Sequence, residues 1–337
     1  MNIVIIGCGL IGRKRALALE QSDKLIACCD VNEELALKFS QEFKCSYFTD
    51  FNKLLKEIEC DSVIVAVTNK YIEEIVKNSI ELGRHIISEK PLGRNYSESD
   101  RIIKCLENYR KELNTFIQLK TGFNHRFHPA IWKAKELVDE NEIGKIFSIR
   151  ARYGHGGRPG MENEWRASKD LCGGGELLDQ GVHVIDLTRW FGGDFNEVYA
   201  NVETKFWNME VEDNAMAMIK TVNGISASLI VSWTNWKNIF SFEIFGTQGY
   251  LKIEGLGGSY GTETLEYGKR NEKGGRPEVQ FFEFSGEDVS WKNEWKEFKS
   301  SVEEKRECIG SGYDGLKANL IIEAMYKSSI DKKTVML

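Results

Sequence analysis

The stretch "NIVIIGCGLIG", residues 2–12, decides the fold of the first part of this chain. A short apolar run, typical of a buried strand, leads into Gly7, Gly9 and Gly12, and a helical pattern follows. In this GxGxxG spacing Gly7 permits a tight turn, Gly9 lets the backbone approach a pyrophosphate, and Gly12 allows the helix to pack closely on the strand. Because the flanking strand and helix are both present, the motif predicts a dinucleotide-binding site.

The next predicted strand, residues 25–31, carries Asp30 at its end. A carboxylate in this place accepts hydrogen bonds from the adenosine ribose hydroxyls and repels a 2′-phosphate. The amides near Leu10 and Ile11, at the start of the helix, are suited to hold the pyrophosphate. The sequence therefore predicts NAD as cofactor, with NADP less suited. Basic residues 13–15 could reach a phosphate, but a solvated helix face is the simpler interpretation.

Two patterns of predicted secondary structure divide the chain into two domains. Residues 1–122 alternate apolar strands with helical patterns, which predicts a doubly wound, parallel α/β (Rossmann) domain with both faces covered. After a helical segment at 129–141, consecutive strand-like runs with Gly or Asn-Gly turns indicate antiparallel pairing. We therefore expect an α+β domain over residues 123–337, with a large antiparallel or mixed open sheet and helices on one face. Helices expected at 291–307 and 314–329 complete this second domain.

Composition excludes several classes of function. The chain has 337 residues and a net charge of -6, with no basic stripe for a nucleic acid and no basic amphipathic helix for a membrane surface. No apolar run is long enough for a bilayer span, and the N-terminus lacks the features of a signal peptide. The eight cysteines form no CxxC pair, which favours free thiols in a reducing cytoplasm over disulfides or a metal site.

Two further motifs bring in chemically active side chains. "SEKPLG" places Glu89 and Lys90 at the end of a predicted strand, where the nicotinamide of a bound cofactor should lie. "GGGELLDQGVH", residues 173–183, places Asp179 and His183 four residues apart, on one face of a helix. The alternatives are a surface lysine neutralised by Glu89 and an ordinary Asp–His pair on a helix face.

Together with the glycine motif, these stretches resemble the glucose–fructose oxidoreductase and inositol dehydrogenase (Gfo/Idh/MocA) family. "GFNHRFHPA" (122–130) and "DGLKANLIIEAMYKSS" (314–329) are similar to further family segments, so the resemblance covers essentially the whole chain. It implies an NAD-dependent oxidoreductase that moves a hydride between the nicotinamide and a ring hydroxyl or keto carbon of a sugar, cyclitol or nucleotide sugar. It also implies His183 as the acid/base, with Lys90 and Asp179 as its partners.

These residue types suit the implied chemistry. A neutral imidazole such as that of His183 can take the proton of an alcohol that loses its hydride. The ammonium of Lys90 can hold the substrate hydroxyl and lower its pKa, and Asp179 can hydrogen-bond the substrate or orient the ring. Pro91 fixes the backbone behind Lys90 and could adopt a cis bond. Glycines 173–175 are expected to let the chain approach the cofactor closely.

The sequence departs from the family at one place. Many members have a Thr-Pro-Asn-like turn after the fourth strand, with a His a few residues on. Here the turn is Val67-Thr68-Asn69, and Ile72 stands where that His would fall. We expect the turn to line the cofactor, whereas the role of the missing His is lost or replaced.

The substrate-contacting residues are expected in two segments that flank the second domain's first strand. Trp165 could stack on a sugar ring, and arginines there could hold a carboxylate or phosphate. His125, His128 and His155 are weaker candidates for catalysis. The predicted substrate-binding residues are Asn124, Arg126, His155, Arg158, Trp165 and Arg166.

Other functions and the assembly state stay open at this stage. The same fold could reduce a non-sugar carbonyl, use bound NAD to hydrolyse glycosides, or serve as a non-catalytic NAD-sensing regulator. An open sheet with helices on one side leaves its other face needing cover. Since residues 228–236 and 240–246 supply apolar side chains on both faces, we expect a homodimer or homotetramer joined through this sheet.

Overall fold

The computed structural model describes all 337 residues, and they form two compact units. Unit 1 comprises residues 1–123 and 291–317, and unit 2 comprises residues 124–290 and 318–337. The break at 123 lies within one residue of the predicted boundary. The expectation that everything after it belongs to the second domain is wrong for 291–317, which pack with the first unit.

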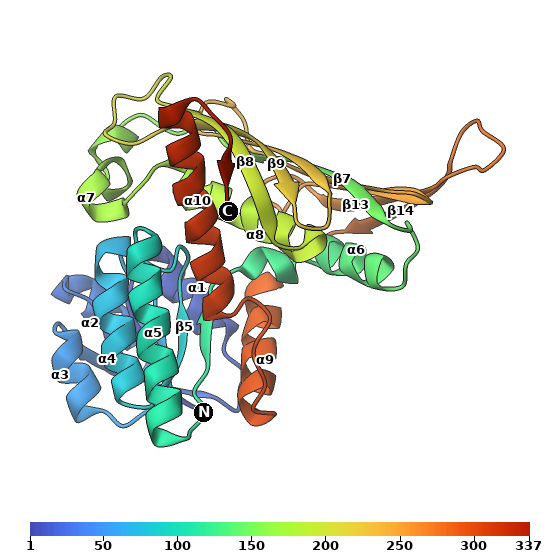
Figure 1. Cartoon of the computed structure of the whole chain (residues 1–337). Helices are drawn as coiled ribbons and strands as arrows, with labels where there is room; N and C mark the ends of the chain where they lie inside the picture. The colour runs from blue at the N-terminus through green and yellow to red at the C-terminus, as the bar shows by residue number, and fades with distance from the viewer. The chain divides into compact units, whose positions relative to one another are not determined.

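Unit 1 is built on a six-stranded sheet that is parallel, as predicted, and its strand order is β3-β2-β1-β4-β5-β6. Helices cover both faces of this sheet (Figure 1). The strands are β1 (Asn2–Ile6), β2 (Lys24–Cys29), β3 (Ser46–Phe48), β4 (Ser62–Val65), β5 (His85–Ser88) and β6 (Leu119–Thr121). The helices are α1 (Leu10–Ala18), α2 (Glu33–Phe43), α3 (Phe51–Glu57), α4 (Ile72–Glu81), α5 (Tyr96–Leu113) and α9 (Ser290–Glu303), the last of which enters the unit from residue 291.

Alternate residues of the central strands point into two separate hydrophobic cores, one on each face of the sheet. Val4 and Val63 pack with helices α3, α4 and α5, whereas Ile5 packs on the other face with α1 and α2. On that second face Trp295 and Phe298 of α9 fill the remaining space. The apolar stripe of α9 therefore completes the first unit, because the first 123 residues supply too few helices to cover this face.

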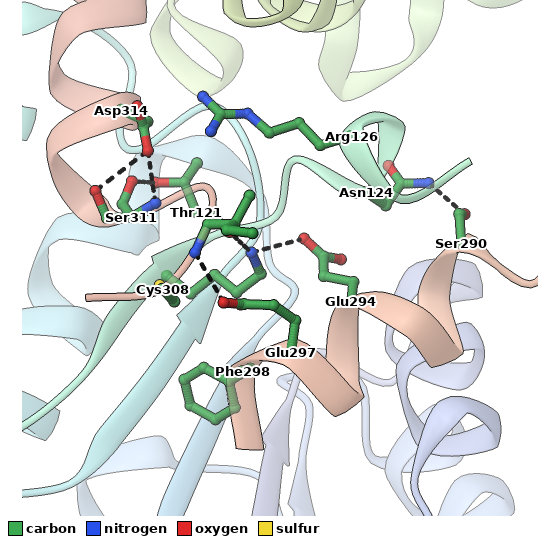
Figure 2. Close-up of polar contacts among 12 residues, drawn as sticks. Thr121, Asn124, Arg126, Ser290, Glu294, Glu297, Phe298, Cys308, Ser311 and Asp314 are labelled. Carbon is green, nitrogen blue, oxygen red and sulfur yellow. Dashed lines mark hydrogen bonds and ion pairs between the residues drawn. The ribbon is translucent and has the colours of Figure 1, made fainter. Parts of the chain in front are cut away.

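A buried cluster of charges also fixes α9 to unit 1. The Arg15 guanidinium donates to the carboxylates of Glu89, at 2.6 Å, and of Glu294 on α9. Glu294 in turn lies 3.6 Å from the ammonium of Lys120, and all four side chains are buried. Figure 2 shows Glu294 projecting from α9 and, beside it, Glu297, which accepts a hydrogen bond from the amide of Ile309.

Unit 2 contains a nine-stranded mixed sheet in the order β14-β13-β12-β11-β7-β10-β9-β8-β15. β7 and β10 run parallel, with Ile149 opposite Ala227, and the other neighbours are antiparallel. Its strands are β7 (Ile146–Gly154), β8 (Phe195–Glu203), β9 (Asn214–Thr221), β10 (Ser226–Ser232), β11 (Ile239–Gly246), β12 (Gly249–Glu254), β13 (Glu263–Lys269), β14 (Glu278–Phe284) and β15 (Val335–Met336). Its helices are α6 (Pro129–Asp139), α7 (Lys169–Cys172), α8 (Val182–Gly192) and most of α10 (Gly312–Asp331).

The two faces of the unit 2 sheet differ in polarity. Side chains that point toward the helices are apolar and buried, whereas alternate residues are exposed. The outward side chains on β8, β9 and β10 include the apolar residues Tyr199, Met216, Met218 and Ile230. Toward the middle of the sheet the outward rows become charged. The predicted open face is therefore present, and it is apolar toward the β8 end. No helix of the protein has the length and apolarity that crossing a membrane would require.

The ion cluster gives a test of stability within one helix. Replacing Arg15 by Met should lower the free energy of unfolding of unit 1 by about 3–5 kcal/mol, because it leaves two buried carboxylates without their guanidinium. Arg13, on the same helix, pairs with Glu42 at an exposed site, so Arg13→Met is the matched control and should change stability little. Chemical denaturation of both variants measures the difference, and equal stabilities would show that the cluster does not anchor the fold.

Candidate active site

The glycine turn after β1 has the geometry that the sequence predicts. Gly7 has φ +103°, and a Cβ there would lie 2.1 Å from the Ala66 carbonyl oxygen. A Cβ at Gly12 would lie 1.8 Å from the Gly7 carbonyl oxygen, so close packing of α1 on the turn requires glycine. A Cβ at Gly9 would meet no atom within 4 Å. The fold therefore requires Gly7 and Gly12, whereas Gly9 keeps open a space in which a ligand can approach the backbone at the start of α1.

Asp30 is held beside this turn by backbone amides. Its carboxylate accepts hydrogen bonds from the Cys8 amide at 2.8 Å and the Asn32 amide at 2.9 Å. These bonds fix the carboxylate at the carboxyl end of β2, where it can also accept from ribose hydroxyls. This geometry fits a dinucleotide with free ribose hydroxyls.

The basic residues after the glycine turn have partners of their own. Arg13 pairs with Glu42 on the surface, which agrees with a solvated helix face. That interpretation is wrong for Arg15, which is buried in the ion cluster described above. Lys14 lies with its ammonium 5.3 Å from the ring centre of Trp291. All three side chains therefore contact other residues of the protein, and their positions give no evidence for a 2′-phosphate on the cofactor.

The ends of β4 and β5 lie next to the glycine turn in the sheet. β1 pairs with β4, and β4 with β5, all in parallel, so residues that follow these strands gather at one edge. Val67, Thr68 and the buried Asn69 follow β4, and Lys90 follows β5. Ile72 is fully buried in the core of unit 1, so it replaces the family's His with a packing residue.

The lysine motif contains a cis peptide bond between Lys90 and Pro91, as the sequence suggested. The carboxylate of Glu89 points to Arg15, with the 2.6 Å hydrogen bond given above. That carboxylate is buried and pairs with Arg15, and the charge of Lys90 also acts on it. The catalytic role of Lys90 stays a prediction. The predicted contact of Glu89 with the cofactor stays a prediction.

In unit 2 the glycine-rich motif leads into a helix that begins as a π-helix and continues as an α-helix. A π-helical segment, Leu177–Gly181, carries Asp179 and continues into α8, which carries His183. A Cβ at Gly174 would lie 2.1 Å from the Tyr326 hydroxyl, and one at Gly175 would lie 1.9 Å from the Glu212 carbonyl oxygen. These two glycines are thus needed for packing inside unit 2, a reason that the sequence did not reveal. π-helical segments of this kind are frequent at functional sites.

His183 is buried and lies against a second imidazole. Its ring stacks on that of His125, with the ring centres 3.6 Å apart and an angle of 14° between the planes. His125 follows the end of β6 in the segment η2 (Asn124–Phe127). The sequence ranked His125 as a weak candidate for catalysis, because nothing in its spacing indicates that it meets His183.

Asp179 meets residues from the loop before α7. The Arg166 guanidinium lies 3.4 Å from the Asp179 carboxylate and stacks over the Trp165 ring, 4.5 Å from its centre. Arg158 forms an ion pair with Glu164 at 2.6 Å, and Glu164 also lies 3.9 Å from the Arg166 guanidinium. The structure thus brings Trp165 and Arg166 to the Asp179 side of the motif, and both arginines have carboxylate partners.

The other predicted substrate residues occupy different environments. Burial lowers the pKa of His155, with the carboxylate of Asp179 acting in the opposite direction. Arg126 forms a buried bidentate ion pair with Asp186 of α8, at 2.7 and 2.5 Å. Asn124 is also buried, between Ser290 and His125. The contacts of Arg126 and Asn124 inside unit 2 are structural, and their predicted contact with a substrate stays a prediction.

Several polar residues near the motif were missed from the sequence. Burial raises the pKa of Tyr153 well above its usual value, and the nearby Tyr260 and Glu176 add to this effect. Burial also raises the pKa of Tyr260, to about 12, and that of the Glu212 carboxyl. Glu176 lies inside the "GGGELLDQ" motif and could have been singled out there. The tyrosines carry no local signal, because strands β7 and β13 and their flanking loops are brought together only by the fold.

Comparisons with known proteins match both units. A family model described as an oxidoreductase family with an NAD-binding Rossmann fold matches residues 1–115, and the GFO/IDH/MocA C-terminal domain matches residues 131–252. Levoglucosan dehydrogenase of Pseudarthrobacter phenanthrenivorans is 30% identical in an alignment that covers 74% of this chain and 73% of that protein. Myo-inositol 2-dehydrogenase of Thermotoga maritima is 28% identical over 349 residues, covering 100% of this chain and 98% of that protein.

Solved structures support the same fold. A levoglucosan dehydrogenase in complex with NADH and levoglucosan superposes with a TM-score of 0.90, at 24% identity, over 100% of this chain and 99% of that chain. A structure of GenD2 from gentamicin A biosynthesis in complex with NAD gives a TM-score of 0.84 at 22% identity, over 100% and 96% of the two chains. At these identities the likeness shows the fold.

The glycine turn separates cofactor binding from folding in a testable way. Gly9→Ala should fold normally, because its methyl group meets no protein atom, but should weaken NADH binding at least about 10-fold by occupying the space for the pyrophosphate. Gly12→Ala should instead lower the stability of unit 1, since its methyl group would meet the Gly7 carbonyl. Fluorescence titration with NADH and chemical denaturation measure the two effects. If Gly9→Ala binds NADH as tightly as the unmodified protein, the glycine turn does not bind the pyrophosphate.

Proposed function

This chain belongs to the GFO/IDH/MocA oxidoreductase family, and from that membership we propose that it is an NAD-dependent dehydrogenase of polyols. Its reaction moves a hydride between the nicotinamide and a ring hydroxyl or keto carbon of a sugar, cyclitol or nucleotide sugar. The observation that carries the proposal is the buried His183 in the same motif as Asp179, which contacts an arginine stacked on Trp165.

The cofactor half of the reaction uses residues at the carboxyl edge of the parallel sheet. NAD supplies the hydride acceptor when it is bound. Asp30 would accept hydrogen bonds from the ribose hydroxyls, and the amides of Leu10 and Ile11 would hold the pyrophosphate. The turn at 67–69 would contact the nicotinamide end of the cofactor. The Asp30 carboxylate favours NAD over NADP, because a 2′-phosphate would meet a like charge.

The substrate half uses His183, Asp179 and Lys90. In oxidation Lys90 holds the reacting hydroxyl and lowers its pKa, so that the proton leaves more readily. A ring nitrogen of His183 accepts this proton, and in reduction the same nitrogen returns it. Asp179 accepts a hydrogen bond from a neighbouring hydroxyl of the substrate. Each of these three side chains acts on the substrate as it loses or gains the hydride.

The arginines near Asp179 favour an uncharged substrate. Arg158 and Arg166 both have carboxylate partners within unit 2, so they offer little excess positive charge to a phosphate or carboxylate. Trp165, which carries the Arg166 guanidinium over one face of its ring, is an aromatic side chain of the kind on which sugar rings stack. His155, Asn124 and Arg126 complete the proposed substrate contacts. These features support a neutral sugar or cyclitol more strongly than a phosphorylated one.

Substitution of the proposed acid/base and its cationic partner tests this function. Lys90→Met and His183→Ala should each lower NAD reduction about 100-fold or more, the usual scale for removing a positioned acid/base or charged group. NADH binding should survive in His183→Ala, because the glycine turn lies in the other unit. Turnover is followed by NADH absorbance with levoglucosan, myo-inositol and related polyols.

Lys53→Met is the control for these variants, since Lys53 is exposed on α3, and it should leave turnover unchanged. If Lys90→Met and His183→Ala both fold, bind NADH and turn over at the rate of the unmodified protein, the proposed mechanism is wrong.

We further propose that the protein is a homodimer, or a homotetramer built from such dimers, joined through the open face of the unit 2 sheet. The exposed apolar side chains of Met216, Met218, Ile230 and Tyr199 support this assembly, because a contiguous apolar patch on a sheet face is typical of an interface. A symmetric dimer would present the same patch from both copies.

Met218→Glu should therefore dissociate the assembly, because it places a charge within the apolar part of the interface. Val222→Glu is the matched control and should leave the assembly intact, since Val222 is also exposed but follows β9, outside the strand. Light scattering at micromolar concentration gives the mass of each variant. A monomeric mass for the unmodified protein would contradict the proposed assembly.

A further inference from the structure

Two buried imidazoles, those of His125 and His183, lie face to face inside unit 2. We propose that His125 is a positioning residue: it remains a neutral ring and stabilises His183 when His183 becomes the cation. This inference rests on the proposed function, in which His183 takes the proton of the substrate alcohol. It assigns to His125 a role that requires no contact with the substrate.

The hydrogen bonds on one side of His125 fix which ring nitrogen carries its proton. The carboxylate of Asp288 accepts a hydrogen bond from the Ser290 hydroxyl at 2.6 Å. Since that hydroxyl has donated its proton, it accepts from the Asn124 side-chain amide at 3.0 Å, a contact drawn in Figure 2. The amide oxygen of Asn124 then faces Nδ1 of His125, 3.2 Å away, and this nitrogen must donate.

The other ring nitrogen of His125 is an acceptor. The Tyr153 hydroxyl lies 3.0 Å from Nε2. Burial raises the pKa of Tyr153 well above its usual value, so its hydroxyl is protonated. The same hydroxyl is hydrogen-bonded to that of Tyr260, which accepts from Gln180. In the proposed network Tyr260 directs its own proton to the Tyr153 oxygen, and Tyr153 donates to Nε2 of His125. His125 therefore has a donor nitrogen paired with an acceptor and an acceptor nitrogen paired with a donor, which is the pattern of a neutral imidazole.

This network closes on the helix that carries His183. Tyr260, whose ring packs 5.1 Å from that of Tyr153, accepts a hydrogen bond from the Gln180 side chain at 2.7 Å. Gln180 belongs to the π-helical segment that leads directly into α8. The same set of contacts thus holds the His125 ring and the start of the helix on which His183 stands.

The stacking geometry suits a pair of rings in which one becomes charged. Two neutral aromatic rings prefer offset or edge-on arrangements, but here the planes are 14° from parallel with centres 3.6 Å apart. A cation over the face of a neutral ring is attracted to it. Two cationic rings at this distance would repel one another. Because His125 is neutral, its ring stabilises the protonated form of His183 in the stack.

Other titratable side chains lie around this stack inside unit 2. His128 meets the His125 ring edge-on, with the centres 5.6 Å apart, and its Nδ1 lies 3.0 Å from the Glu263 carboxylate. Tyr153 lies against both histidine rings. These ring contacts leave Asn124 as the partner of Nδ1 and Tyr153 as the partner of Nε2 of His125.

Nuclear magnetic resonance of the full-length protein, with 15N in its five histidines, tests the state of His125 without any substrate. The resonance pair lost in His125→Phe identifies the residue. We expect a neutral ring with its proton on Nδ1 at neutral pH, and we expect Tyr153→Phe to shift Nε2 more than Nδ1. A cationic ring, or a proton on Nε2, would overturn the proposal.

Kinetics then separate a stacking role from simple packing. With NAD and levoglucosan or myo-inositol, His125→Leu should lower kcat about 10-fold, the scale of losing a cation–π contact in a desolvated site, with little change in KM. His125→Phe keeps an aromatic face and should stay within about 3-fold of the unmodified protein. Equal kcat in the two variants, or a change confined to KM, would show that His125 only fills space.

The two tests also separate this inference from the proposed function. If His183→Ala turns over normally, His183 is not the acid/base and the proposed function fails, whatever the resonances of His125 show. If His183→Ala is inactive while the leucine and phenylalanine variants behave alike, only the role of His125 is rejected. Should the leucine variant not fold, the resonances of Tyr153→Phe still decide whether the network fixes the ring.

Discussion

A guanidinium buried between two carboxylates organises the cofactor-binding unit. Arg15 belongs to the helix that begins at the glycine turn, Glu89 directly precedes Lys90, and Glu294 comes from α9, far along the chain. Breaking such a buried set by losing one partner is strongly unfavourable. The glycine turn, the strand end before Lys90 and the returning helix α9 are therefore fixed as one arrangement, and residues 291–317 must fold with the first unit.

The sequence predicted the parallel sheet well because its signals are local. The GxGxxG spacing, the apolar strands and the acid at the end of β2 all lie within short windows, and each reappears in the structure. The placement of α9 was wrong because an apolar stripe shows that a helix is half buried but does not show which unit covers it. The burial of Arg15 was missed for a related reason, since Glu294 lies 279 residues away.

In the candidate site the sequence located the motif but not its surroundings. Asp179 and His183 were singled out from one stretch of eleven residues, because their spacing and side chains indicate chemistry. The ring that stacks on His183 was not, because the stack with His125 and the hydrogen bond between His125 and Tyr153 join segments that meet only in the folded unit. Glycines 174 and 175 were noticed, but close packing on Tyr326 and Glu212 now explains them.

In the proposed reaction, a hydride is transferred from a ring carbon of a polyol to NAD. Myo-inositol and levoglucosan carrying deuterium on their ring carbons test this directly, with mass spectrometry of the nicotinamide cofactor after turnover. We expect NADH that contains one deuterium and a polyol oxidised at one carbon. NADH without deuterium, or a changed polyol with no accumulation of NADH, would contradict a net dehydrogenase and point instead to a reaction that returns the hydride to its substrate.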